Sequence, residues 1–446
     1  MNTPIYDFAR QYADSEAIRM HMPGHKGKPF LGCEPLDLTE ISGADELFAP
    51  EGIIAESEQN ASGIFGCRTL YSTEGSSLCI RAMLYLIMQH AAAAGRKPVI
   101  AAGRNVHKTF LTAAALLQFE IIWLEQSPDA SYLSGCMTES SLQSLCDASD
   151  PPVAVWLTSP DYLGNLADIR QAASFCRAHD MLLAVDGAHG AYLRFLKHSL
   201  HPADLGADLC CTSAHKTLPV LTGGAYLHIA DIAPEHLREN AKAAMALFAT
   251  TSPSYLILES LDLCNRYLEA DFAPQLSACT AHLDNLRQTL LHHGWTLCGA
   301  EPMKLTLRTK PYGYTGTELA AILQSQNIHV EFADPDYLVM MPSPMNTPEE
   351  LETVCDALCR IPKRAPVTEL PPPIPATHTQ AMPLHAVLSA CTETIPVSQC
   401  TGRICAEFSV SCPPAVPIVI CGERISSVAI RCMQYYHITA CRVVKV

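Results

Sequence analysis

The sequence predicts an α/β fold, with a large domain built on a mostly parallel sheet flanked by helices, a small α+β domain and a short C-terminal module. Three observations lead to this fold class. Between about residues 78 and 229, short apolar segments of strand length alternate with amphipathic segments of helical period, which is typical of parallel sheets with crossover helices. A second, shorter alternation of helix and strand patterns follows. A proline-rich segment then separates it from the last part of the chain.

The large domain is expected to contain six short apolar strands. They are residues 99–102, 121–124, 153–157, 182–185, 208–212 and 225–229. Segments with a helical period lie between them, at residues 78–94, 109–119 and 169–179. Because ligands collect at the carboxyl ends of strands in such sheets, polar residues that follow these strands are the candidate functional residues.

The second half of the chain begins with a helical stretch from residue 254 to about 293, which is expected to break near Pro274. The small domain is predicted to contain strands at residues 304–308, 328–332 and 337–341 and helices at residues 315–326 and 347–361. We divide the chain into an N-terminal arm (1–30), a large domain (31–272), a small α+β domain (273–365), a proline-rich linker (366–376) and a C-terminal module (377–446).

Composition and charge limit the classes of function. Hydrophobic residues make up 48% of the 446 residues, yet no apolar run approaches the roughly 20 residues that a membrane span requires. The formal net charge of -15 argues against a nucleic-acid partner and favours cationic ligands. Residues 1–10 show no basic segment followed by an apolar one, so we expect a cytoplasmic protein without a membrane partner.

The chain has 20 cysteines, which are scattered and include no Cys-x-x-Cys pair. We therefore expect reduced, mostly buried thiols rather than a disulfide framework. Seven of them lie at irregular spacing near the end of the chain: Cys391, Cys400, Cys405, Cys412, Cys421, Cys432 and Cys441. Zinc sites normally show paired short spacings, so no metal site is expected there.

Ser213, His215 and Lys216 form the most informative segment, directly after the predicted strand 208–212. A lysine amine can condense with an aldehyde, and a neighbouring hydroxyl and imidazole can bond a phosphate, so this combination suits pyridoxal 5'-phosphate. The alternative is a surface lysine at the junction of a strand and a loop.

Other predicted strands end in residues that would complete such a site. Asp186 follows strand 182–185, and its carboxylate could keep a pyridine nitrogen protonated or simply cap a helix. Ser76 and Ser77 precede a predicted helix, where hydroxyls and free N–H groups form a phosphate seat or a plain N-cap. His107 follows another strand and could stack on a cofactor ring or have a structural role. Residues 158–164 end a further strand and could line a pocket.

These segments resemble the major domain of the ornithine/lysine/arginine decarboxylase family, which are pyridoxal phosphate enzymes of the aspartate-aminotransferase-like fold. The resemblance covers nearly the whole chain and includes the segments His21 to Gly27, Gly43 to Gly52, Thr250 to Tyr255, Pro413 to Pro417 and Gly422 to Ile425. The shorter, Gram-positive-type members are the most similar, since no response-regulator-like domain precedes the Pro-Gly-His-Lys segment.

The resemblance implies a role for each candidate residue. Lys216 would bond covalently to the cofactor's aldehyde, Asp186 would contact the pyridine nitrogen, and His189, close to the substrate, would complete the catalytic set. His107 would stack on the cofactor ring, and Ala188 would lie under it. The phosphate would be held by Ser76, Ser77, Ser213 and His215. The active site would be shared across a homodimer, with Thr251 and Ser252 reaching the neighbouring subunit's cofactor.

The sequence departs from the family pattern at three positions. Glu74 stands where asparagine is usual, and its negative charge could weaken cofactor binding at the adjacent phosphate seat. Cys421 replaces a common proline, and Ala415 replaces a usual glycine.

The expected activity is decarboxylation of lysine, arginine or ornithine to the corresponding amine and carbon dioxide. Glu46, Asp45 and Glu423 are candidates for contact with the substrate's distal cation, with ordinary surface charge as the alternative. Two other functions are open. One is a different pyridoxal phosphate reaction, such as transamination with Arg308 binding the substrate carboxylate, and the other is a non-catalytic protein that kept the fold.

Overall fold

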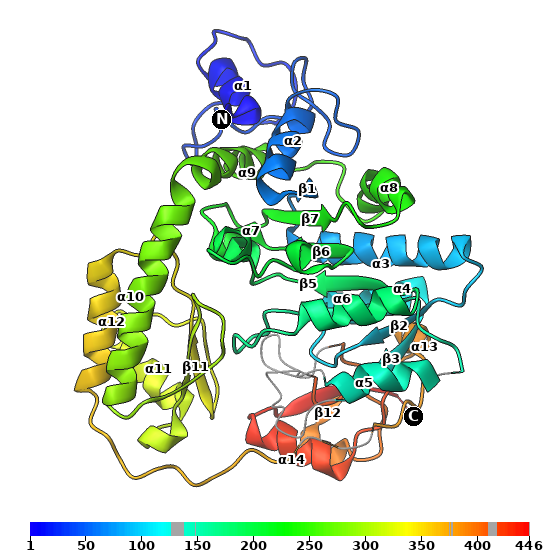
Figure 1. Ribbon diagram of the computed structural model, residues 1–446, viewed down its shortest axis with the longest axis vertical. Helices are drawn as coiled ribbons and strands as arrows, with labels where there is room; N and C mark the ends of the chain where they lie inside the picture. Colours follow the sequence, from blue (N-terminus) through cyan, green and yellow to red (C-terminus); the bar gives the residue numbers. More distant parts are fainter. Residues whose placement is uncertain (126–137, 148, 374, 376–377, 409–416, 446) are drawn as a thin grey trace. The chain divides into compact units, whose positions relative to one another are not determined.

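The computed structural model describes the chain except residues 126–137, 148, 374, 376–377, 409–416 and 446. The chain divides into two compact units, which are described separately below (Figure 1). The first unit comprises Met1–Pro98, Val153–Trp156 and Asp168–Leu276, and the second comprises Val99–Pro152, Leu157–Ala167 and Ser277–Val446. Ala415, Cys412 and part of the predicted linker lie outside the described residues, and the predicted domain boundaries stay a prediction.

A seven-stranded sheet has strands in both units. In the first unit the strands lie in the order β1 (Arg68–Ser72), β7 (Ala225–Ile229), β6 (Leu209–Thr212) and β5 (Leu182–Asp186). The next strand, β4 (Ala154–Thr158), begins in the first unit and ends in the second, which holds β2 (Val99–Ala102) and β3 (Glu120–Trp123). β5 pairs in parallel with β6, and β2 with β3, whereas β7 pairs antiparallel with both β1 and β6. The predicted class, α/β with a large, mostly parallel sheet flanked by helices, is confirmed.

Apolar residues bury the strands of the first unit on both faces. Every residue of β5, β6 and β7 is buried, as expected for strands that helices cover. Helix α3 (Gly75–Ala93) packs against β6, β7 and α8 (Glu235–Ala246), and α6 (Ile169–Ala178) packs against β5. In the register of the parallel pair, Asp186 lies opposite Cys211, so the residues that follow β5 and β6 emerge at the same edge.

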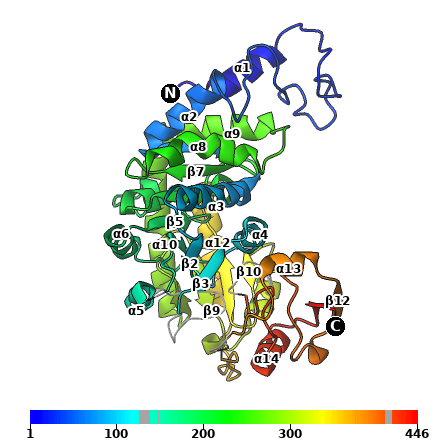
Figure 2. The same cartoon turned by 90° about the vertical axis from the view of Figure 1, so that its right-hand side faces the viewer.

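Three helices pack together at the N-terminal end of the first unit (Figures 1 and 2): α1 (Pro4–Ala13), α2 (Ile53–Phe65) and α9 (Tyr255–Tyr267). Asp262 of α9 accepts hydrogen bonds from the N–H groups of Ile5 (2.9 Å) and Tyr6 (3.0 Å), which satisfies two otherwise unpaired donors of the first turn of α1.

Helix α9 continues through the π-helical turn Leu268–Phe272 into α10 (Ala273–His292). A break was predicted near Pro274, and the helix is irregular there but does not end. The irregularity is the π turn, and Pro274 follows it as the second residue of α10, so the turn accommodates the missing N–H.

The second unit contains a four-stranded antiparallel sheet in the order β10-β11-β9-β8. Its strands are β8 (Thr296–Cys298), β9 (Leu305–Arg308), β10 (Phe332–Ala333) and β11 (Tyr337–Met340). Capping boxes begin the helices α11 (Gly316–Gln324) and α12 (Pro348–Arg360). The predicted strand 328–332 is wrong over most of its length, because only Phe332 and Ala333 pair with β11. The preceding Asn327 adopts a left-handed conformation (φ 59°) that leads out of α11.

The last part of the second unit folds around its own core. Strands β12 (Thr392–Pro396) and β13 (Ala440–Val444) form an antiparallel pair, accompanied by the helices α13 (Leu384–Ser389) and α14 (Ser427–Tyr435). Four of the buried core residues are Cys400, Cys405, Cys432 and Cys441. All cysteines in the described part of the chain are free thiols.

The described residues contain no group of three or more His, Cys, Asp or Glu side chains with the geometry of a metal site. They also contain no helix that is long and apolar enough to cross a membrane.

Candidate active site

Lys216 and His189 lie side by side at the carboxyl ends of β6 and β5. Lys216 belongs to the one-turn helix α7 (Ala214–Thr217) that follows β6, and its Nζ lies 3.1 Å from Nε2 of His189. His189 follows β5 by three residues and is only 7% exposed. An imidazole at this distance from an amine can exchange a proton with it, which is the geometry of a nucleophile with an adjacent base.

Asp186 is the last residue of β5 and is only 3% exposed. Its Oδ1 accepts a hydrogen bond from the N–H of Ala188 at 3.1 Å and from the Cys211 thiol of β6 at 3.8 Å. Burial, and then the charge of Asp186, raise the pKa of Cys211, so this thiol keeps its proton. The carbonyl of Ala188 accepts a hydrogen bond from the N–H of Ser213 at 3.2 Å, which joins the loops after β5 and β6.

Hydroxyl groups that are expected to hold the phosphate meet at the start of α3. Ser213 Oγ donates to Ser76 Oγ at 2.9 Å. Ser76 and Ser77 lie in the first turn of α3, where the N-cap residue Glu74 makes no side-chain hydrogen bond to the helix. N–H groups of a first turn that no side chain caps, together with two hydroxyls, form a donor set that suits an anion.

His215 faces the backbone of Gly224. Its Nδ1 lies 3.0 Å from the Gly224 carbonyl oxygen, and its backbone N–H donates to the same oxygen at 3.2 Å. The neighbouring Gly223 accepts a hydrogen bond from the N–H of Gly75 at 2.7 Å. A Cβ on Gly223 would lie 2.8 Å from the carbonyl oxygen of Thr73, and φ there is +105°, so this approach requires glycine.

Both of these glycines were missed in the sequence, although a Gly-Gly pair directly before a buried strand signals a close approach of another backbone. Cys211, which donates to Asp186, was also missed. No local pattern reveals it, because its contact depends on the pairing of β5 with β6.

His107 lies in the second unit, at the N-cap of α4 (Lys108–Leu117). Its Nδ1 accepts a hydrogen bond from the N–H of Thr109 at 3.2 Å and lies 2.9 Å from Thr109 Oγ1. These bonds fix the orientation of the imidazole ring. The first unit brings together Asp186, Ala188, His189, Ser213 and Lys216, and the stacking role of His107 stays a prediction.

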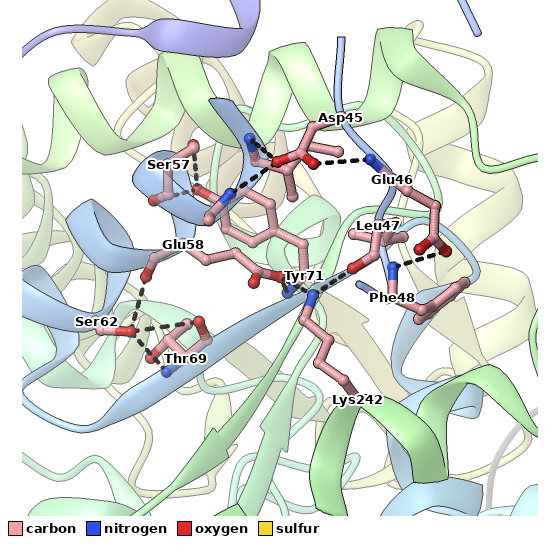
Figure 3. A network of polar contacts seen from close by, with 12 residues as sticks. Asp45, Glu46, Leu47, Phe48, Ser57, Glu58, Ser62, Thr69, Tyr71 and Lys242 are labelled. Atoms are coloured by element: carbon pink, nitrogen blue, oxygen red, sulfur yellow. Dashed lines mark hydrogen bonds and ion pairs between the residues drawn. The ribbon is translucent and has the colours of Figure 1, made fainter. Parts of the chain in front are cut away.

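The Asp45 carboxylate is bound by backbone N–H groups of the protein (Figure 3). Its carboxylate accepts hydrogen bonds from backbone N–H groups that include those at the start of α2, and the donors are Glu46, Glu51, Gly52, Ile54 and Ala55. Burial acts to raise the pKa of Asp45, but these donors outweigh it and lower the pKa below its ordinary value. Glu46 Oε1 accepts a hydrogen bond from the N–H of Phe48 at 3.3 Å. The geometry of Asp45 is that of a helix-capping residue.

A buried ion pair lies in the same network (Figure 3). Lys242 of α8 donates to Glu58 Oε1 of α2 and to the carbonyl of Leu47, both at 2.6 Å. Glu58 Oε1 also accepts the N–H of Tyr71 in β1 at 2.8 Å. Burial raises the pKa of Glu58 despite the opposing charge of Lys242. The pair thereby ties the segment after Asp45 to β1 and α8.

Glu423 is only 2% exposed and is surrounded by donors. Arg104 Nη1 lies 2.7 Å from its Oε1, and Arg104 Nη2 lies 3.1 Å from its Oε2. Oε2 also lies 3.3 Å from His378 Nδ1 and accepts the N–H of Ile420 at 2.8 Å. Burial acts to raise the pKa of Glu423, but the hydrogen bonds from His378 and Arg104 bring it to about 2. The carboxylate is therefore ionised and paired within the protein.

The remaining predicted residues lie on the rims of the two units. Thr251 and Ser252 are exposed in the loop between α8 and α9 of the first unit. In the second unit, Arg308 ends β9, and its guanidinium lies 6.0 Å from the ring centre of Tyr337.

Comparison with known proteins agrees with the fold. The model of the major domain of Orn/Lys/Arg decarboxylases matches residues 3–308, and the model of their C-terminal domain matches residues 370–442. The arginine decarboxylase of Bacillus subtilis is 29% identical over 95% of this chain and 91% of its own length. The arginine decarboxylase of Halalkalibacterium halodurans is 28% identical over the same shares of the two chains.

Solved structures show the same fold at lower identity. A lysine decarboxylase from Francisella novicida gives a TM-score of 0.80 at 15% identity, covering 99% of this chain and 81% of that one. The constitutive lysine decarboxylase of E. coli gives 0.79 at 16% identity, covering 100% and 82%. The predicted family and enzyme class are confirmed. The chain belongs to the ornithine/lysine/arginine decarboxylase family and is an amino acid decarboxylase.

Proposed function

We propose that this protein uses pyridoxal 5'-phosphate to decarboxylate a basic amino acid, releasing carbon dioxide and the corresponding amine. The observation that carries the proposal is the contact of Lys216 Nζ with His189 at 3.1 Å, beside the buried carboxylate of Asp186 at the end of the neighbouring parallel strand. A lysine, a base and a carboxylate at one sheet edge suit a cofactor that needs a covalent anchor and a protonated ring nitrogen.

The residues present fit this cofactor. The hydroxyls of Ser76 and Ser213, 2.9 Å apart at the start of α3, are placed to bond its phosphate with Ser77 and His215. When bound, pyridoxal phosphate supplies a sink for the electron pair that remains at the substrate's α-carbon.

Two groups of this chain handle the protons of the reaction. Asp186 would keep a proton on the cofactor's ring nitrogen, because a buried carboxylate favours a cationic partner. Lys216 Nζ, in contact with His189 Nε2, returns a proton to the α-carbon after carbon dioxide has left. Asp186 and His189 are buried, and a site with little water favours loss of the carboxylate as a neutral gas.

Arginine is the substrate that we propose, with lysine and ornithine as competitors in the same assay. Two of the curated relatives similar to this chain along its length are named arginine decarboxylases. The net charge of -15 also favours a cationic substrate.

We also propose a cytoplasmic homodimer with shared active sites. Thr251 and Ser252 are exposed in their loop, as residues that reach into a neighbouring subunit must be. Large apolar side chains of the N-terminal segment are 70–93% exposed, and they are Ile18, Met20, Met22, Phe30 and Leu31. Such a patch is typical of an interface, and a second copy of this chain is the occupant that the shared site requires.

Reductive trapping tests the covalent anchor. Borohydride reduces the bond between lysine and cofactor to a stable amine, so the peptide that carries Lys216 is expected to gain the mass of one phosphopyridoxyl group. Lys242→Ala serves as a matched control, because it removes a buried amine of the same unit and leaves labelling at Lys216 intact. Labelling of another lysine, or none, would contradict the proposal.

A further inference from the structure

Arg104 and Glu423 form a buried ion pair within the second unit, although they lie 319 residues apart. Their side chains are only 6% and 2% exposed, and two nearly parallel N–H···O contacts of 2.7 and 3.1 Å join them. A bidentate pair fixes orientation as well as distance. Removal of one partner from such a pair leaves an uncompensated buried charge, so the position of each side chain depends strongly on the other.

Backbone contacts on both sides hold Glu423 in place. Its N–H donates to the carbonyl of Ile420 at 3.0 Å, and its own carbonyl accepts the N–H of Cys405 at 2.9 Å. The preceding Gly422 has φ +87°, and a Cβ there would lie 2.2 Å from the carbonyl oxygen of Met382, so only glycine fits this turn. A rigid turn of the C-terminal region therefore presents the carboxylate.

Arg104 lies on the other side of the pair, in the loop that joins β2 to α4 and ends at His107. Its guanidinium also lies 5.4 Å from the ring centre of Trp123 in β3, the strand that pairs with β2. Helix α13 of the C-terminal region packs against α4 (Figures 1 and 2). The His107 loop, defined as residues 103–107, is therefore fixed from the C-terminal region at Arg104 and by the N-cap bonds to Thr109 at its far end.

We propose that Arg104 and Glu423 are positioning residues that set the orientation of His107. His378 Nδ1 lies 3.3 Å from Glu423 Oε2 and also helps to fix this carboxylate. The proposal rests on the proposed function for the role of His107 at the cofactor ring. It assigns the C-terminal region a task in catalysis that requires no direct contact with the substrate.

A second buried pair of the same unit provides the control. Lys310 Nζ lies 2.9 Å from Asp336 Oδ1, and both side chains are 9% exposed. Tyr435 of α14 donates to the same oxygen at 2.6 Å, so this pair also joins the C-terminal region to an earlier part of the unit. Asp336→Asn therefore disturbs a comparable contact that does not involve the His107 loop.

The experiment compares Glu423→Gln and Asp336→Asn by amide hydrogen exchange on the protein without cofactor. In Glu423→Gln, exchange of the peptide that covers residues 103–112 is expected to accelerate by roughly tenfold or more, because Arg104 loses its counter-charge. Asp336→Asn is expected to leave that peptide at the wild-type rate. Addition of pyridoxal phosphate then gives a second readout, the visible circular dichroism of the bound cofactor, which is expected to change only in Glu423→Gln.

Equal exchange of residues 103–112 in the two variants, or wild-type exchange in Glu423→Gln, would overturn the proposal. Arg104→Lys keeps the positive charge but loses the planar guanidinium that contacts both carboxylate oxygens. It replaces Glu423→Gln if that variant does not fold. The exchange readout does not depend on the cofactor. If the wild-type protein binds no pyridoxal phosphate, the proposed function is refuted. Hydrogen exchange still decides whether the Arg104–Glu423 pair holds the His107 loop.

Discussion

At the scale of single residues, Glu74 shows how one side chain departs from a family pattern without blocking the site. Its Oε1 accepts the N–H of Thr250 at 2.8 Å, so the carboxylate is turned toward the loop between α8 and α9 and does not cap α3. Its backbone is fixed in turn, since its N–H donates to Ser72 Oγ at 3.1 Å. The side chain thus makes no capping bond to the first turn of α3 and holds the segment that leads to Thr251.

Removal of the Glu74 charge is expected to tighten binding of pyridoxal phosphate. Glu74→Gln keeps an acceptor for Thr250 and removes a negative charge near the phosphate seat, so the dissociation constant should fall by roughly three- to tenfold at low salt. Glu74→Asn is expected to change it in the same direction. Spectroscopic titration measures the constant, and Glu239→Gln on the exposed face of α8 is the charge-matched control. Unchanged or weaker binding in both Glu74 variants would show that the charge does not act on the cofactor.

A buried histidine makes stability depend on pH. His201 is fully buried, neither of its ring nitrogens has a hydrogen-bond partner among the described residues, and burial lowers its pKa to about 4. Below the ordinary pKa of about 6.5, the unfolded chain takes up a proton that the folded protein does not. The free energy of unfolding should therefore fall between pH 6.5 and 4, by about 1.4 kcal/mol for each pH unit at most.

Thermal unfolding across this pH range checks the prediction. His201→Gln cannot titrate and should lose less stability on acidification than the wild type, whereas His198→Gln, an exposed neighbour of the same unit, should follow the wild-type slope. If the wild type and His201→Gln lose stability equally on acidification, His201 does not contribute to the pH dependence.

The roles of single residues could be predicted where they depend on the neighbouring residues in the sequence. Lys216 and Asp186 follow apolar strands directly, and a sheet edge brings such residues together. The partners of Glu74 and Glu423 lie 176 and 319 residues away, and nothing in the local sequence indicates them. The capping contacts of Asp45 could not be predicted for a related reason. Its N–H donors follow it by one to ten residues, across an irregular loop without a periodic pattern and into the start of α2.

At the scale of elements, the start of α2 depends on a carboxylate outside the helix. Gly52, the N-cap residue, has no side chain that could satisfy the first N–H groups, and Asp45 takes over that task. We expect Asp45→Ala to lower the free energy of unfolding by about 1–3 kcal/mol. Chemical denaturation measures the loss, with the exposed Asp14→Ala as a control that should change little. Equal stability of the two variants would contradict a capping role.

The six strands predicted for the large sheet agree with the structure to within one residue at each end, because burial on both faces gives strands such as β7 continuous apolar runs. The helices α1, α2 and α8 were not predicted. Elements without such a run were missed. β1 (Arg68–Ser72) has a polar residue at three of its five positions, and β8 spans only three residues. The alternation of Ile328, Val330 and Phe332 imitates a strand, but the pairing with β11 begins only at its end, where Glu331 N–H donates to the Val339 carbonyl and Phe332 lies opposite Val339.

At the scale of the whole molecule, the C-terminal region is tied into the second unit at two separate points. Glu423 pairs with Arg104 at the His107 loop, and Asp336 pairs with Lys310 and with Tyr435 of α14. The first contact joins segments that the family models assign to different domains, since Arg104 lies within residues 3–308 and Glu423 within residues 370–442. Lys310 and Asp336 lie between the two matched ranges. Under the proposal that Glu423 positions the His107 loop, this short module without the proposed cofactor-binding residues acts on a loop of the major domain.

The most direct measurement of the central claim is the turnover of arginine, lysine and ornithine by the wild-type protein with pyridoxal phosphate, following carbon dioxide and amine together. The account predicts equal amounts of both products from arginine, and a loss of roughly 10³-fold or more in Lys216→Ala, in which the covalent anchor and its proton transfer are absent. Keto acid in place of carbon dioxide, or equal turnover in Lys216→Ala, would contradict it.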